Sequence, residues 1–255
     1  MILALKLLLA PMLIGLVSLA GRRWGPAVGG WLVSLPLTSA PVMLFLAIDQ
    51  GTAFASGAAQ DTLLGIMSVA SFCLVYYWFS FRFGWSMSML AGWGAFFALT
   101  LILEAITLPL LLSFVAVTVF LTIVLIVMPT SQSKDITIHP PPWDTPLRML
   151  VATAFVLGLT AAAAIMGPHL SGLLAPFPMF TTILAVFTHH IQGASPTRRL
   201  LRGVVAGSFT FVIFFLVISM LVNKWGIAVA FGVAILAAMA THSASLFLIR
   251  RNSNA

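Results

Sequence analysis

The chain has 255 residues, of which 61% are hydrophobic and 7% are charged, and its formal net charge is +7. Soluble globular proteins carry about 25% charged residues, so this composition excludes a soluble protein and predicts an integral membrane protein. The single cysteine, Cys73, excludes an intramolecular disulfide.

Apolar segments close to the ~20 residues that a helix needs to cross a bilayer follow one another along the chain. In chain order they cover residues 2–20, 27–48, 57–80, 85–103, 107–128, 149–166, 169–189, 204–222 and 226–249. Strands of a membrane barrel would alternate apolar and polar residues, whereas residues 110–128 are apolar on every face. We therefore predict an all-α polytopic membrane protein with about nine transmembrane helices.

The sequence also repeats itself at an offset of 142 residues. The shift aligns Gly25-Pro26 with Gly167-Pro168, Gly30 with Gly172, Pro36 with Pro178, Gln50-Gly51 with Gln192-Gly193, Gly65 with Gly207 and Gly84 with Gly226. Matches of Gly and Pro carry the most weight because these residues mark special backbone positions.

Four spans match four others, and the fifth has no counterpart, so the second copy enters the membrane upside down. This 4+1+4 inverted repeat is an architecture of many secondary transporters. The predicted parts are the first four-helix repeat at 1–106, a connecting helix at 107–128, a Pro-rich cytoplasmic strap at 129–147 and the inverted repeat at 148–251.

The basic residues predict which way the chain crosses the membrane. With the N-terminus outside, ten of the twelve Lys and Arg residues lie on the cytoplasmic side, and Lys6 and Lys224 lie outside. This is a positive-inside bias, and it places the C-terminus in the cytoplasm. The positive charge then reflects membrane topology, so we expect no nucleic-acid partner.

Two corresponding spans are interrupted by proline near mid-membrane depth. Each proline frees backbone carbonyl groups, and unwound backbone at this depth is tolerated only where it faces protein or a wet cavity. We expect the substrate site between the two interruptions, where hydroxyl groups lie beside the prolines. The predicted binding residues are Pro36, Thr38, Ser39, Pro41, Pro176, Pro178, Thr181 and Thr182. The other interpretation is a pair of ordinary kinks whose hydroxyls bond back to their own helix.

Ionisable residues in or beside apolar spans are costly and therefore mark candidate functional positions. Asp61, Glu104 and His242 are candidates for proton coupling, and Asp49 and the pair His189-His190 are candidates for an outer and an inner vestibule. Each also has a structural interpretation, as an interfacial residue or, for His242, as a packing residue. The adjacent histidines point about 100° apart on a helix, so we expect no metal site.

The run from Gly172 through Gly193 to Gly207 contains the stretch SGLLAPFPMF. It resembles the GlpM-like family of small bacterial inner-membrane proteins, which have four helices and a comparable AGLxPxFPxF stretch. The first half departs from this pattern, since it reads LPLTSAP where the second reads FPMFTT. The resemblance implies two fused four-helix units in the bacterial inner membrane, and the positive-inside bias then predicts the N-terminus in the periplasm. The family is linked to exopolysaccharide production but has no defined biochemical activity. The resemblance therefore implies an architecture rather than a substrate.

Enzyme signatures such as a phosphate-binding glycine loop, GxSxG or HExxH are missing from the sequence, so we expect neither an enzyme nor a cofactor. We predict a secondary transporter or permease for a small solute that is neutral or amphipathic. The alternative is a non-transporting membrane subunit of an envelope polysaccharide or lipid-processing assembly. The expected partners are the small-molecule substrate and membrane lipid, and a homodimer is left open.

Overall fold

The computed structural model describes residues 2–36, 39–106, 108–129, 140–158 and 177–253, and the secondary structure of these residues is helical without strands. The helices are α1 (Ile2–Trp24), α2 (Pro26–Val33), α3 (Ser39–Asp49), α4 (Thr52–Phe79), α5 (Trp85–Glu104), α6 (Leu110–Val127), α8 (Met179–Gln192) and α9 (Ala194–Ser253). A further helical segment covers residues 144–158. The all-helical fold predicted from the sequence is confirmed for these residues.

Four of the described helices are long and apolar enough to cross a membrane, namely α4, α5, α6 and the stretch Ala194–Ala244 of α9. Helix α6 illustrates the surface that such a protein presents. Leu111 and Ile126 are 72% and 75% exposed on one side of this helix, whereas Val117 and Leu121 are fully buried on the other. Apolar side chains on both the buried and the exposed faces suit a helix between a protein core and lipid.

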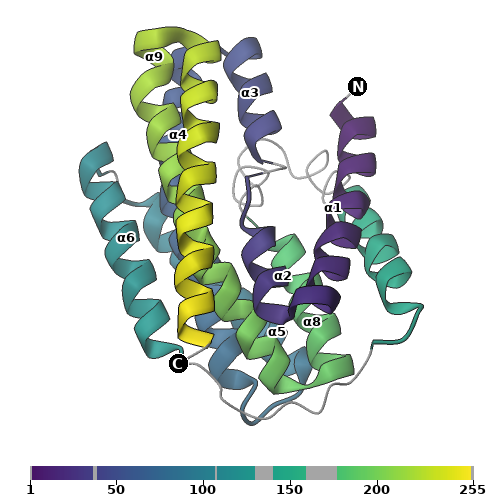
Figure 1. The fold of residues 1–255 in the computed structure, drawn as a ribbon. Helices are drawn as coiled ribbons and strands as arrows, with labels where there is room; N and C mark the ends of the chain where they lie inside the picture. The colour runs from purple at the N-terminus through teal and green to yellow at the C-terminus, as the bar shows by residue number, and fades with distance from the viewer. Residues whose placement is uncertain (1, 37–38, 107, 130–139, 159–176, 254–255) are drawn as a thin grey trace.

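Helix α9 is two helices that meet at Gly226, whose φ of 75° and ψ of 173° are not helical. We call residues 194–225 the first arm and residues 227–253 the second arm. Figure 1 shows the chain reversing direction here, with the two arms side by side. The N-terminus lies at the same end of the bundle as this reversal, and the C-terminus lies at the opposite end.

Glycines with positive φ also separate other helices. Gly25, Gly51 and Gly193 have φ values of 96°, 89° and 89°, and each lies between the end of one helix and the start of the next. An L-residue with a side chain rarely adopts this conformation, so these positions favour glycine. The turns of the bundle are therefore encoded locally.

The predicted span 27–48 consists of two helices. Helix α2 ends at Val33, a short turn follows in which Leu35 N–H donates to Leu32 O at 3.2 Å, and α3 begins at Ser39. Pro36 lies in this break. Pro41 lies instead in the first turn of α3, where its missing N–H breaks no helical hydrogen bond.

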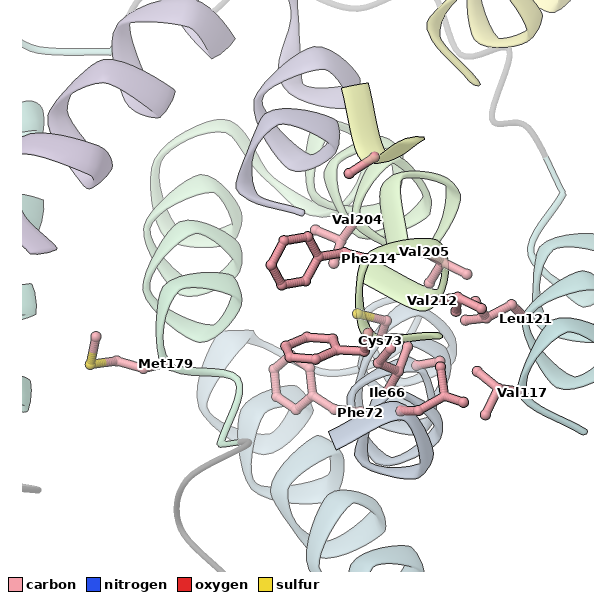
Figure 2. Packing of buried hydrophobic residues seen from close by; sticks show 14 of the residues in the cluster. Ile66, Phe72, Cys73, Val117, Leu121, Met179, Val204, Val205, Val212 and Phe214 are labelled. Atoms are coloured by element: carbon pink, nitrogen blue, oxygen red, sulfur yellow. The ribbon is translucent and has the colours of Figure 1, made fainter. Parts of the chain in front are cut away.

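The core lies where α4 packs along the first arm of α9, with α6 against both. Figure 2 shows Phe72 and Cys73 of α4 near Phe214 of α9, while Val117 and Leu121 approach from α6. All five of these side chains are fully buried. The two long helices therefore form the centre around which the shorter ones are arranged.

Small residues allow α2 to cross the first arm of α9 closely. A Cβ atom added to Gly207 would lie 2.8 Å from Trp31 O, and one added to Gly203 would lie 3.0 Å from the carbonyl carbon of Ala27. Ser34 Oγ donates a hydrogen bond to Val204 O at 2.8 Å across the same contact. Small residues commonly bring helices together in this way in membranes, where lipid removes the hydrophobic drive for association.

Candidate functional site

The first interrupted segment has a buried hydroxyl beside its break. Pro36 is buried, and Ser39 Oγ is buried with no hydrogen-bond partner among the described residues. Helix α3, which carries Ser39 and Pro41, packs mainly against α4 and α9. Thr38 lies outside the described residues.

The second interrupted segment is packed more tightly. Pro178 immediately precedes α8, and Thr181 and Thr182 are 5% and 3% exposed in its first turn. Thr182 Oγ1 accepts a hydrogen bond from Trp93 Nε1 at 3.2 Å. Pro176 lies outside the described residues.

Phe177 covers the start of α8 with an aromatic cluster. Its ring lies 5.4 to 5.8 Å from the rings of Trp93, Phe96, Phe97 and Phe155, which come from α5 and from the segment 144–158. Thr182, through Trp93, is therefore held beside this aromatic cluster. No hydrogen bond among the described residues joins Ser39 to Thr181 or Thr182, although α2 and α8, which adjoin the two breaks, are in contact.

His242 is turned into the protein and connects three helical segments. Its ring is stacked on Trp31 of α2 with centroids 3.5 Å apart, and its Nδ1 lies 2.9 Å from Thr210 Oγ1 on the first arm of α9. The neighbouring hydroxyls behave differently, because Thr241 and Ser243 donate to carbonyl groups of their own helix. Among these three neighbouring residues, the described contact with α2 is made by His242.

The remaining sequence candidates lie at helix ends or on exposed faces. Asp49 and Glu104 are the last residues of α3 and α5 and are exposed, as is Asp61 on α4. His189 Nδ1 lies 3.3 Å from the Tyr76 hydroxyl, whereas His190 is exposed and meets the edge of Trp85. The structure thus separates the two adjacent histidines, and the described residues contain no group of three His, Cys, Asp or Glu that could hold a metal ion.

A buried ionic cluster lies where α1 meets the segment 144–158. Asp144 accepts hydrogen bonds from Arg148 Nε at 2.8 Å and from Arg22 Nη2 at 3.1 Å. The side chains of Asp144 and Arg148 are 1% and 4% exposed, and that of Arg22 is 26% exposed. Arg22 also donates to Pro141 O, so it joins α1 to the chain that enters the second half.

A cavity adjoins this cluster. Its lining includes the three charged residues together with Ser18, Thr188 and Gln192. Burial lowers the pKa of the Arg148 guanidinium, and the hydrogen bond from Arg148 to Asp144 opposes this effect. The cluster therefore holds charge away from water.

This cluster was not predicted from the sequence, because Asp144 lies in the segment 129–147 that was expected to be a polar strap. One signal was available, since Asp144 and Arg148 are four residues apart and can pair on one helix face. The third member, Arg22, is 122 residues from Asp144, and only the fold brings it there.

Comparisons of the chain with models of protein families, with curated proteins and with solved structures find no match.

Proposed function

We propose that this chain is a secondary transporter or permease that moves a small solute across a membrane by alternating access between two inverted four-helix repeats. The repeats are residues 1–106 and 148–251, and the helix at 107–128 connects them. Exchanging the conformations of two inverted repeats converts a shape open to one side into a shape open to the other.

Helix boundaries at the offset of 142 residues support the repeat. Helix α4 begins at Thr52 and α9 begins at Ala194 (194 − 52 = 142). The glycines before them, Gly51 and Gly193, have the same φ of 89°, with ψ values of 166° and −175°. A helix break also occurs at two glycines related by the same offset, Gly84, which precedes α5, and Gly226, which divides α9 (226 − 84 = 142).

Pairs of contacts related by exchange of the two halves are the observation that carries the proposal. Ser56 and Ser219 donate hydrogen bonds to each other's carbonyl oxygen, at 2.9 and 3.1 Å. Adding 142 to 56 and subtracting it from 219 gives Arg198 and Tyr77, and the Arg198 guanidinium lies 6.0 Å from the Tyr77 ring centre. The two pairs join opposite ends of α4 and the first arm of α9, so these helices run antiparallel, as inverted copies require.

Helix α6 supplies a second such pair. Gln60 Nε2 donates to Leu108 O at 2.5 Å, just before α6 begins, and Arg202 Nη1 donates to Leu125 O at 2.6 Å, near its end. Gln60 and Arg202 are related by the same offset (202 − 60 = 142). Helix α6, which has no counterpart, is thus held near each end by equivalent side chains of the two repeats. This arrangement suits a connector that lies across the pseudo-twofold axis relating the repeats.

The same arrangement supports about nine crossings, because the two arms of α9 supply two. We propose that the N-terminus and the Lys224 turn face the periplasm of a bacterial inner membrane and that the C-terminus faces the cytoplasm, as the positive-inside bias favours. The resemblance to GlpM-like proteins fits two fused units of this kind. The substrate site between the interrupted segments, and the coupling roles of Asp61, Glu104 and His242, form part of this proposal.

Alternating access can be tested where the first helices of the two repeats meet. A Cβ atom added to Gly15 of α1 would lie 3.7 Å from Met149 Cγ, so cysteines at both positions lie within reach of a mercury ion that bridges two thiolates. A solute that binds is first identified by thermal unfolding of the purified protein. A ligand at 100 times its dissociation constant raises the free energy of unfolding by about 2.7 kcal/mol and so raises the melting temperature. Uptake of that solute is then measured in proteoliposomes.

We expect the mercury bridge between Gly15→Cys and Met149→Cys to abolish uptake and an excess of thiol to restore it. The two single-cysteine variants are the matched controls, and Cys73 does not interfere because it is fully buried. Uptake by the bridged protein at the unbridged rate would rule out separation of these helices. Failure of every solute to stabilise the protein, together with its copurification with an envelope enzyme, would instead favour the alternative of a non-transporting subunit.

A further inference from the structure

The cavity beside Arg22, Asp144 and Arg148 has an unbalanced charge. Among the described residues, the ion pairs of both arginines are with Asp144, so two positive charges face one negative charge. Asp144 and the Arg148 side chain are almost completely buried. These two charges balance each other, so the surplus positive charge lies on Arg22, whose side chain is 26% exposed and can pair with an anion that enters the cavity.

The neutral lining also favours a polar ligand. Ser18 is 6% exposed and borders the cavity, and its Oγ has no hydrogen-bond partner among the described residues. Thr188 and Gln192 add a hydroxyl and an amide from α8. Several buried hydroxyls of the described residues lack a partner, but that of Ser18 borders this cavity, so it is a donor available to a bound group.

We infer that this cavity is a binding site for a small oxyanion with a single negative charge, a monocarboxylate in chemical class. One such charge would balance the surplus of the cluster, and guanidinium groups bind carboxylates through paired hydrogen bonds. Ser18 supplies a further donor. The site lies at the end of the bundle opposite the N-terminus of α1, between α1, α2, the segment 144–158 and α8.

Asp144 occupies the arginines when the site is empty and competes with the ligand. Arg22 is the more accessible arginine, and both of its described hydrogen bonds come from Nη2. A bound carboxylate takes the place of Asp144 at Arg22, while Asp144 keeps its bond with Arg148. This competition predicts that removal of the Asp144 charge strengthens anion binding.

Binding of a monocarboxylate in this cavity does not depend on transport, whereas transport of the bound monocarboxylate would rest on the proposed function and would be a substrate assignment different from the neutral or amphipathic solute expected from the sequence. Binding and uptake are therefore measured separately. Acetate is the probe, acetamide is its neutral counterpart of the same shape, and sodium chloride keeps the ionic strength constant. The first measurement is the melting temperature of the purified full chain in detergent.

We expect acetate to raise the melting temperature of the wild-type protein and acetamide to leave it unchanged. The shift should disappear in Arg22→Gln and persist in Arg23→Gln, since Arg23 lies one residue away and does not line the cavity. In Asp144→Asn the dissociation constant for acetate should fall about tenfold. The double variant Asp144→Asn with Arg148→Gln has the net charge of the wild-type cluster, so a gain that comes from lost competition at Arg22 should persist in it, whereas a gain that comes from added positive charge should be lost.

Equal effects of acetate and acetamide, or an acetate shift that survives in Arg22→Gln, would overturn the site. So would weaker acetate binding in Asp144→Asn. Acetate binding without uptake by proteoliposomes would leave the site intact and remove only the substrate assignment. Uptake of another solute without any acetate shift would remove the site and leave the transporter proposal standing.

Discussion

The close crossing of α2 and α9 makes a prediction that can be worked out from backbone geometry. In Gly203→Ala the new methyl group would meet the carbonyl group of Ala27, with its carbon 3.0 Å away and its oxygen closer, and would lie 3.1 Å from Trp31 N. These neighbours are backbone atoms of α2, so no side-chain rotation relieves the contact. The two helices must move apart.

Gly232 on the second arm of α9 provides a matched control, because nothing lies within 4 Å of an added Cβ atom there. Replacing glycine by alanine inside a helix gains about 1 kcal/mol through lower backbone entropy of the unfolded chain. Both substitutions should gain this stability, so the difference between the unfolding free energies of the two variants isolates the effect of the clash. Overpacking costs about 1–3 kcal/mol, and Gly203→Ala should be less stable than Gly232→Ala by that amount.

Reversible unfolding in mixed detergent micelles, followed by tryptophan fluorescence, measures this difference. If Gly203→Ala were as stable as Gly232→Ala, α2 would not approach α9 as closely as the structure has it. Because α2 leads directly to the break at Pro36, we also expect Gly203→Ala to change substrate affinity, which Gly232→Ala should leave unaltered.

Three further predictions follow from other contacts. His242→Phe keeps a ring against α2 but loses the bond to Thr210, so it should cost about 0.5–1.5 kcal/mol of unfolding free energy; full additivity with Thr210→Val in a double-mutant cycle would show that the bond contributes nothing. Thr182→Val removes a hydroxyl of the predicted substrate site and should weaken affinity up to about tenfold, and an unchanged dissociation constant would remove Thr182 from the site. In intact cells, Asn223→Cys should react with a membrane-impermeant thiol reagent and Asn254→Cys should not; the reverse pattern would invert the proposed orientation.

The turns of this protein were predictable because they depend on local backbone chemistry. The break at Pro36 follows from a missing N–H, and the reversal at Gly226 follows from a conformation that glycine favours. Helix ends were less predictable. Helix α9 begins at Ala194, ten residues before the predicted span 204–222, because hydropathy falls at the arginines although the helix continues through them. Arg198 stacks on Phe81, with its guanidinium carbon 4.0 Å from the ring centre, so packing supports the polar turns.

The candidate sites were also predictable only in part. Hydroxyls beside the interrupted segments could be named from the sequence, but their partners could not, since Thr182 meets Trp93 from a helix 89 residues away. The burial of Asp144 was hidden for a related reason. Polar composition marks a segment as solvent-exposed, whereas two arginines brought together by folding allow a carboxylate to be buried.

The two donors that hold the ends of α6 differ in charge although they have the same structural task. A carbonyl oxygen can accept a hydrogen bond from the Gln60 amide or from the Arg202 guanidinium. Exchanging them, as Gln60→Arg with Arg202→Gln, would keep a donor at each end and carry one positive charge to the opposite side of the bundle. Because positive charges beside the spans bias the direction of membrane insertion, this pair of substitutions tests separately how the chain folds and which way round it is inserted.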